Sequence, residues 1–270
     1  MTVVTTSVPV LMYHEITTSP AGSARLAVSP RSFETQIAYL HDAGFNAVTA
    51  GDLAAAAAGR TALPCRPVVL TFDDGFADFH EIALPILQKH GFTATLFMTT
   101  GWIRDGAQRQ SSAPGRMLSW SQLAEIAAAG IEVGGHSDQH PQLDQLETGA
   151  VHRELAASKE ALEDTLGLPV PGMAYPFGYS NAQVRRLAAE VGYSYAYAVG
   201  NRKFGSEPDQ FSLPRLTVGR STRLHTYQQI AACRKLRVIF LKDRSLTKGW
   251  AVARRARRAR LYPSHADHNR

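Results

Sequence analysis

The sequence predicts an α/β protein made of repeated strand–helix units around a parallel sheet or barrel. Short apolar runs alternate with segments whose apolar residues recur at helical spacing. One of these runs, Val68–Phe72, is rich in β-branched residues and is typical of a strand buried on both faces. A chain of 270 residues, of which 44% are hydrophobic, is long enough for one such domain with a short appendage.

Local signals place the individual elements. Ser29-Pro30 is a helix N-cap followed by proline at the first helical position, and Gly44 stands where a C-cap glycine belongs. Phe33, Ile37 and Leu40 line one face of the helix between them. By the same criteria, strands are expected near residues 8–13, 47–49, 68–72, 94–99, 131–133, 172–175, 195–199 and 216–218, and helices near 52–58, 79–90, 120–129, 148–166 and 181–191. Residues 103–117 are predicted to form a loop.

The positive charge of the chain is concentrated at its C-terminal end. Residues 231–270 hold 12 Lys and Arg against 2 Asp, whereas the preceding 230 residues hold 17 basic and 21 acidic residues. Past about residue 225 the pattern also becomes helical and basic. We therefore expect a catalytic domain over residues 1–225 and a basic, helical or partly disordered tail over residues 226–270.

No targeting or membrane-spanning segment is expected. Met1–Ser7 carries no Lys or Arg, and the apolar stretch after it ends at His14-Glu15, which is too soon for a signal peptide. The sequence has no run of about 18 apolar residues that could cross a bilayer. Cys65 and Cys233 lack metal-site spacing, so two free thiols are expected, a disulfide being the alternative. These features predict a cytoplasmic protein.

Polar groups follow four of the predicted strands at their carboxyl ends. The groups are Asp73-Asp74-Gly75, His136–His140, Pro176-Phe177-Gly178 and His14. In a parallel barrel, catalytic residues collect at this edge. Asp-Asp-Gly alone is a common turn sequence, and a histidine pair alone is more often a surface feature. Their occurrence at successive strand ends makes a shared site the better interpretation.

The residue types in these groups suit a catalytic metal site. His136 and His140 can point the same way if their segment is helical, and both imidazoles can then bind one ion. A carboxylate from another strand would complete a three-ligand site with an open position for water. A second carboxylate that does not bind the metal can accept a proton from that water. Asp73 and Asp74 could divide these two tasks because neighbouring side chains point in different directions.

These residues also resemble the motifs of the polysaccharide deacetylase family, which is the NodB-homology domain and family four of the carbohydrate esterases. Thr71–Gly75 resembles the first motif of this family, His136–His140 the second, and Ala174–Gly178 a variant of the third. Leu11–His14 and Val28–Gln36 resemble the branch that contains the bacterial poly-N-acetylglucosamine deacetylases.

The resemblance covers roughly residues 8–220 and implies a distorted (β/α) barrel of seven or eight strands, to which the charge pattern adds a basic helical C-terminal extension. It also implies one divalent metal ion, commonly zinc. Carried over by position, Asp74, His136 and His140 would be the metal ligands. Asp73 would be the general base that takes a proton from the metal-activated water.

Further roles follow from the same resemblance. Ser137 would support the histidine loop, and the backbone N–H of Phe177 would help to stabilise the oxyanion of amide cleavage. Tyr175, Pro176 and Gly178, which surround Phe177, would contact substrate.

The third motif departs from the family pattern at its first residue. The family usually has an arginine there that holds the catalytic aspartate, whereas this chain has Ala174. Arg215, just before the last predicted strand, is the candidate replacement. A surface arginine or one that anchors a loop is the alternative interpretation.

The fourth and fifth family motifs have no clear counterpart. Trp102 and Trp120 lie in other regions than the family's pocket tryptophan, and Trp250 lies in the tail. Leu224-His225 has the wrong spacing for the general-acid histidine and is expected to open a helix. His14, at a strand end, is therefore the preferred histidine for lending a proton or binding substrate, and a packed, non-catalytic histidine is the alternative.

The sequence as a whole predicts a hydrolase that removes an N-acetyl group from an amino sugar in a glycan or glycan precursor. One alternative keeps the metal centre but gives it a non-sugar amide or an O-ester. Another is a catalytically weakened family member that binds glycan or membrane.

The basic tail permits several interpretations. The segment Trp250–Arg260 is expected to form a helix with a dense arginine face. It is either a solvated tail or a peripheral anchor to anionic membrane. Nucleic acid is a disfavoured partner, because no groove-reading motif or aromatic platform is present.

Overall fold

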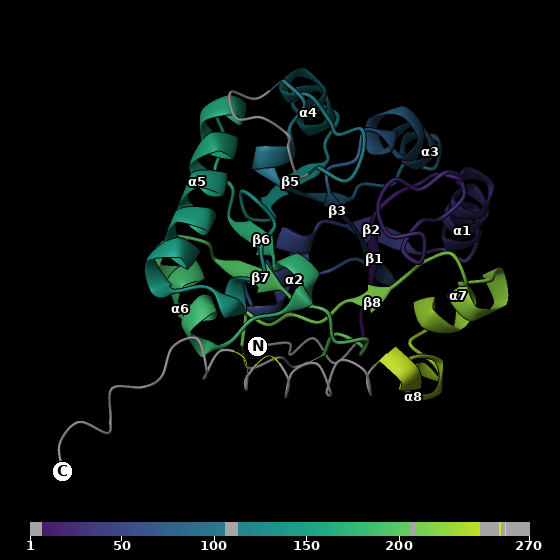
Figure 1. The fold of residues 1–270 in the computed structure, drawn as a ribbon. Coiled ribbons are helices and arrows are strands. Elements are labelled where there is room, and N and C mark those ends of the chain that lie inside the picture. Colours follow the sequence, from purple (N-terminus) through teal and green to yellow (C-terminus); the bar gives the residue numbers. More distant parts are fainter. Residues whose placement is uncertain (1–6, 106–112, 206–208, 244–253, 255–256, 258–270) are drawn as a thin grey trace, which may run out of the picture.

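A computed structural model describes residues 7–105, 113–205 and 209–243, together with Arg254 and Arg257. At its centre is a parallel sheet with the strand order β7-β6-β5-β4-β3-β1-β8, in which β2 pairs with β3 beside this row (Figure 1). The strands are β1 Val10–Tyr13, β2 Asn46–Val48, β3 Pro67–Asp74, β4 Thr95–Met98, β5 Glu132–Gly135, β6 Gly172–Ala174, β7 Tyr195–Tyr197 and β8 Leu216–Thr217. The predicted α/β class and the distorted (β/α) barrel are confirmed.

One short segment closes the barrel by joining the two edges of the curled sheet. Leu213 forms an isolated parallel bridge with Tyr197 of β7, and Leu216 of β8 pairs with Leu11 of β1. Residues 213–217 therefore span the gap between the first and the last strands of the curled sheet. Arg215 lies in the middle of this segment, so closing the barrel fixes its position.

Most of the helices surround the sheet on its outer face. The helices are α1 Pro30–Asp42, α2 Ala50–Ala57, α3 Leu84–Lys89, α4 Trp120–Ala128, α5 Thr148–Leu166, α6 Ala182–Glu190, α7 Leu224–Ala231 and α8 Leu236–Ile239. In Figure 1, α1, α3, α4, α5 and α6 lie around the outside of the strands. The helix predicted at residues 79–90 is found as a π-helical turn, Phe79–Ala83, that continues into α3.

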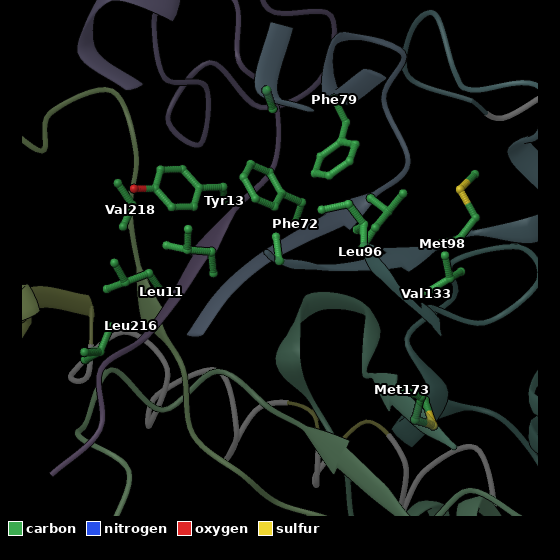
Figure 2. Close-up of a cluster of buried hydrophobic side chains, with 14 of the residues drawn as sticks. Leu11, Tyr13, Phe72, Phe79, Leu96, Met98, Val133, Met173, Leu216 and Val218 are labelled. Atoms are coloured by element: carbon green, nitrogen blue, oxygen red, sulfur yellow. The ribbon is translucent and has the colours of Figure 1, made fainter. Parts of the chain in front are cut away.

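Alternate residues of the strands face two apolar layers. Phe72 belongs to the layer between the sheet and the helices, where its ring stacks on Tyr13 at a centroid distance of 5.2 Å. Figure 2 shows these two rings beside Leu96 of β4. Val69 points the other way, into a smaller cluster with Tyr197 inside the barrel. This alternation is what places polar side chains of β3 inside the barrel near its end.

Helix α2 closes the amino-terminal end of the barrel. The Ala50 N–H donates to Thr95 Oγ1 at 2.8 Å, and the Gly51 N–H donates to Glu132 Oε2 at 3.0 Å. Thr95 and Glu132 are the first residues of β4 and β5, so the helix terminus sits against the strand starts and its partial positive charge faces a carboxylate. An accessible site is therefore expected at the opposite, carboxyl ends of the strands.

Helix α7 packs onto the barrel through Tyr227. The Tyr13 hydroxyl donates to the Tyr227 hydroxyl at 3.1 Å, and Ile230 and Phe240 join the same hydrophobic core. The domain boundary near residue 225 remains a prediction, but the packed core includes residues beyond it.

The arginine-rich helix predicted at Trp250–Arg260 lies outside the described residues, except for Arg254 and Arg257. Arg254 Nε is 2.9 Å from Asp144 Oδ2, and its guanidinium lies over the Tyr179 ring. This contact attaches one residue of the basic tail to the loops that follow β5 and β6.

Other predictions concern loops and thiols. The described parts of the predicted loop, residues 103–105 and 113–117, contain no helix or named strand. Cys65 and Cys233 are both free, as expected. Among the described residues, none of the helices combines the length and apolar character needed to cross a membrane. The cytoplasmic location remains a prediction.

A buried carboxyl group, Glu15, and a half-buried one, Asp78, tie the loop after β1 to the barrel. Glu15 accepts hydrogen bonds from the backbone N–H groups of Ala21 and Gly22 at 2.9 and 3.0 Å. Asp78 accepts one from the Ile16 N–H at 3.1 Å. Burial, assisted by the nearby charge of Glu15, raises the pKa of Asp78 to about 7.

The pKa of Asp78 makes stability depend on pH. Because this pKa rises from 3.8 to about 7, the folded state keeps a proton that the unfolded chain releases. The stability gained is complete below the unfolded pKa and is lost as the pH rises through the folded pKa. We expect the unfolding free energy of Asp78→Asn to fall less than that of the wild type between about pH 4 and pH 7. Urea unfolding measures both slopes, with the exposed Asp164→Asn as control, and equal slopes would contradict the assignment.

Candidate metal centre

Strand β3 ends in two buried aspartates whose side chains lie in different surroundings. Asp73 is 3% exposed and points into the barrel, whereas Asp74 is 8% exposed and adopts a left-handed backbone with φ 77°. Gly75 continues this turn with φ 89°. A Cβ at Gly75 would lie 2.1 Å from Met98 Sδ, so the turn requires glycine. The turn separates the two carboxylates although they are neighbours in the chain.

Asp74, His136 and His140 form a cluster of three potential metal ligands. Asp74 Oδ1 is 3.5 Å from His136 Nε2 and 3.3 Å from His140 Nε2. Neighbouring ligand atoms of a tetrahedral zinc site with bonds near 2.1 Å lie about 3.4 Å apart. Asp74 Oδ1 is buried and has no hydrogen-bond donor among the described residues. The three residues therefore fit a divalent cation.

The segment that carries the two histidines is a loop and not a helix. Ser137 and His140 have left-handed backbones, with φ 64° and 56°, and the His140 N–H donates to Ser137 Oγ at 3.0 Å. Glu154 of α5 accepts from two consecutive loop N–H groups at 3.1 and 2.8 Å. Both imidazoles reach Asp74 because these contacts fold the loop back on itself. The role of Glu154 had no signal in the sequence, since it lies in the middle of a helix.

A backbone contact fixes the protonation of His136. Its Nδ1 is 2.8 Å from the carbonyl oxygen of Ala174. A carbonyl can only accept, so Nδ1 carries the proton and Nε2 offers its lone pair on the side of Asp74. Ala174, which lacks the family's arginine side chain, thus contributes its backbone to the centre.

Arg215 reaches Asp73 from the segment that closes the barrel. Its Nη1 is 2.5 Å from Asp73 Oδ1 and its Nη2 is 2.8 Å from Asp73 Oδ2, which is a bidentate pair. Arg215 is fully buried, and its guanidinium lies 5.5 Å from the centre of the Phe97 ring. The alternative of a surface arginine is therefore wrong, and the guanidinium makes the contact with Asp73 that a replacement arginine was predicted to make.

The charges around the two aspartates keep both ionised. Burial alone would raise the pKa of Asp73, but the guanidinium of Arg215 outweighs it and the pKa is lowered. Burial likewise opposes ionisation of Asp74, yet the imidazoles of His136 and His140 hold its pKa well below the usual value.

His14 lies at the end of β1 beside Asp73. Its Nε2 is 4.0 Å from Asp73 Oδ2, its side chain is 15% exposed, and its Nδ1 has no hydrogen-bond partner among the described residues. Burial lowers the pKa of His14, although Asp74 and Asp73 oppose this change. The imidazole is therefore neutral near pH 7 and open to a proton.

Two aromatic rings flank His140. Phe177 lies 4.7 Å and Trp102 4.8 Å from the His140 ring, centre to centre. Phe177 has φ 59° and is 50% exposed, whereas Trp102 is 7% exposed. Placing Trp102 in another region was wrong: it follows β4 at the carboxyl end of that strand. Its position after a predicted strand was the signal that could have identified it.

The prediction that Tyr175 contacts substrate is wrong for its side chain. Tyr175 is fully buried, and its hydroxyl donates to the Phe211 carbonyl at 3.0 Å. Pro176 and Gly178 are also buried. Of these four consecutive residues, Phe177 alone exposes its side chain, so a contact with substrate from this segment falls to Phe177.

Sequence comparison defines the class of protein to which this site belongs. A model of the family described as polysaccharide deacetylase matches residues 60–196, a stretch that contains Asp73, Asp74, His136, His140 and Phe177. The chain belongs to the polysaccharide deacetylase family.

Individual relatives agree with this assignment. The chain is 27% identical to YxkH of Bacillus subtilis over 210 residues, which cover 78% of this chain and 71% of that protein. It is 26% identical to a poly-β-1,6-N-acetyl-D-glucosamine N-deacetylase of Staphylococcus aureus, over 71% of this chain and 68% of that protein. The structure of the Streptococcus pyogenes deacetylase PplD in complex with acetate superposes with a TM-score of 0.75 at 26% identity, covering 84% of this chain and 98% of that one. These likenesses support a carbohydrate deacetylase.

The ion pair inside the barrel yields a stability prediction. Arg215→Met leaves the Asp73 carboxylate buried without its partner, which should lower the unfolding free energy by about 3–5 kcal/mol at neutral pH. The loss should shrink in acid, where Asp73 is protonated. Arg186→Met removes an exposed arginine paired with Glu190 and is the matched control, expected to change stability by about 0.5 kcal/mol or less. Equal urea midpoints for the two variants would contradict this account.

The cluster of Asp74, His136 and His140 yields a binding prediction. Calorimetric titration of the metal-free protein with zinc should give roughly one site per chain. His136→Ala and Asp74→Asn should each weaken this site by about 100-fold or more, since each removes one of three protein ligands. His152→Ala removes an exposed histidine of α5 and should leave the site unchanged. Unaltered zinc affinity in Asp74→Asn would exclude this cluster as the metal site.

Proposed function

We propose that this protein is a metal-dependent hydrolase that removes an acetyl group from the nitrogen of an amino sugar in a glycan or glycan precursor. One observation carries the proposal. Beside the cluster of Asp74, His136 and His140 stands a second ionised carboxylate, Asp73, which is paired with Arg215 and is not part of the cluster. A structural metal site has no use for such a group, whereas hydrolysis needs a base near the ion.

Asp74, His136 and His140 would hold one divalent ion. Two imidazoles and one carboxylate are a donor set that suits zinc, and they leave a coordination position free. When bound, the ion supplies a Lewis acid that polarises the acetyl carbonyl and lowers the pKa of water. The protonated Nδ1 of His136 and the contact between Ser137 and His140 hold the two imidazoles toward this position.

Asp73 is the general base in this proposal. Its lowered pKa keeps it ionised at neutral pH, so that it can accept a proton from the attacking water. Arg215 holds both carboxylate oxygens in place and acts as a positioning residue. The hydroxyl of the water then bonds to the acetyl carbon.

His14 and Phe177 complete the reaction. Neutral His14, 4.0 Å from Asp73, can receive the proton from Asp73 and deliver it to the sugar nitrogen as the carbon–nitrogen bond breaks. The backbone N–H of Phe177 would donate to the negative oxygen that forms on the acetyl carbon. The half-exposed Phe177 ring, next to His140, offers an apolar face to a sugar ring.

The relatives support an N-acetylated glycan as the substrate class, because the Staphylococcus aureus relative is named for removing acetyl groups from an N-acetylglucosamine polymer. A non-sugar amide or an O-ester remains the enzymatic alternative. The third candidate is a weakened family member that only binds glycan or membrane. Two departures from the family pattern favour it: the missing arginine at Ala174 and the missing tryptophan motif. The pairing of Arg215 with Asp73 argues against the first of these.

Substitution of Asp73 tests the assigned base. Asp73→Asn keeps the side-chain shape, so the zinc site should survive while acetate release falls by about 10²- to 10⁴-fold. Acetate is measured enzymatically after incubation with an N-acetylglucosamine oligomer, and zinc is measured on the same sample. Asp164→Asn, an exposed change on α5, is the control. Full acetate release by the zinc-loaded Asp73→Asn protein would refute the role.

Matched substrates separate the remaining alternatives. N-acetylated sugar oligomers, O-acetylated sugars and acetylated peptides are offered to the same zinc-loaded protein. The proposal expects release from the first group at least about tenfold faster, measured as kcat/KM. Preference for the other substrates, with loss in Asp73→Asn, would keep the metal chemistry and reject the substrate class.

A further inference from the structure

The C-terminal helix α8 presents apolar side chains to solvent. Val238 is 75% exposed and Leu241 is 65% exposed, more than any other large hydrophobic residue that the structure describes. Leu241 lies just beyond α8, which ends at Ile239, and both side chains face solvent. Leu236 and Phe240 of the same stretch are buried against the core. Their burial already attaches this stretch to the barrel, so the exposed apolar residues are not needed for that contact.

Basic residues surround this apolar face. We use "α8 surface" for Val238 and Leu241 together with the exposed basic residues Arg234, Lys235, Arg237 and Lys242. Residues 232–242 contain no Asp or Glu, and Asp243, which follows them, forms an ion pair with Arg25. The α8 surface therefore combines protruding apolar groups with four positive charges and no negative charge of its own.

We propose that the α8 surface binds the face of an anionic lipid bilayer. Exposed aliphatic side chains ringed by Lys and Arg are the composition that lets a helix lie in the interface of a membrane. The aliphatic groups enter the boundary of the acyl chains, and the cations pair with lipid phosphates. This location differs from the arginine-rich segment at Trp250–Arg260, which follows it in the chain.

The charge of this surface disfavours two other occupants. A second copy of the chain would bring its own four basic residues against the first set and be repelled. The tail that follows this surface is also basic, with 8 Lys and Arg against 2 Asp over residues 243–270. A lipid surface instead offers the negative charge and the apolar interior that the two kinds of side chain require.

The position of α8 orients the barrel. Asp243 contacts Arg25, which lies in the loop that follows His14 at the carboxyl end of β1. The Arg25 carbonyl accepts from the Arg220 N–H at 3.0 Å, just past the carboxyl end of β8. The α8 surface is thus joined to the barrel edge that carries the metal centre. If the proposed function holds, the substrate is a glycan attached to or adjacent to a membrane; the lipid contact itself does not depend on that function.

Vesicle sedimentation of the full chain tests the proposal. The protein should bind vesicles of phosphatidylcholine mixed with phosphatidylglycerol and should stay in solution with phosphatidylcholine alone. Val238→Ser combined with Leu241→Ser should weaken binding by about tenfold through lost apolar burial. Arg237→Gln combined with Lys242→Gln should weaken it by about tenfold or more, and high salt should do the same to the wild type. Leu168→Ser, a 60% exposed apolar residue beyond α5, is the matched control and should bind like the wild type.

Two further measurements exclude misfolding and self-association as explanations of a loss of binding. Urea midpoints and acetate release from a small soluble substrate should be equal in all these proteins, which separates the lipid contact from folding and from the proposed function. Light scattering without vesicles should show no change of mass among the variants. Binding of anionic vesicles by the Val238/Leu241 variant as tight as that of Leu168→Ser would overturn the proposal. A dimer that this variant abolishes would assign the surface to a second copy instead.

Discussion

Asp73 and Arg215 come from the central and the closing strands of the barrel and meet where water is excluded. Each charge is costly to bury alone, and each is tolerated because the other is held at bidentate distance. The segment of residues 213–217 bridges β7 and β1, and Arg215 in its middle enters the interior, where the Asp73 carboxylate receives it. The segment that closes the sheet therefore also orients the proposed base.

The rest of the centre is built around this pair by local backbone geometry. The left-handed turn at Asp74 and Gly75 sends the second carboxylate away from Arg215 and toward the histidines. The loop of residues 136–140 needs left-handed residues of its own to bring both imidazoles to that carboxylate. Strain of this kind is retained where the surroundings enforce it, here by Ser137 and Glu154.

Periodicity and capping predicted most of the elements, because each strand–helix unit has its own apolar pattern and its own glycine stop. The cluster of Asp74, His136 and His140 was also predictable, since strand ends in a parallel barrel converge. Three features were not predictable from the sequence: the contact of Trp102 with His140, the support of the histidine loop by Glu154, and the burial of Tyr175. They depend on how loops from different strands fold over one another, and no local pattern records that. For Arg215 the residue was visible in the sequence, but its direction followed only from the bridge at Leu213.

The sequence position of Arg215 bears on how members of this family are classified as active or inactive. The guanidinium that holds Asp73 comes from the segment between β7 and β8, while the position beside His136 keeps only the carbonyl of Ala174. The same positive charge beside the aspartate can be supplied by residues at different positions in the sequence. A classification by the order of sequence motifs would treat this chain as an inactive family member, although the arginine that pairs with Asp73 is present. Members of this group are therefore better compared by superposing their structures than by aligning their sequences.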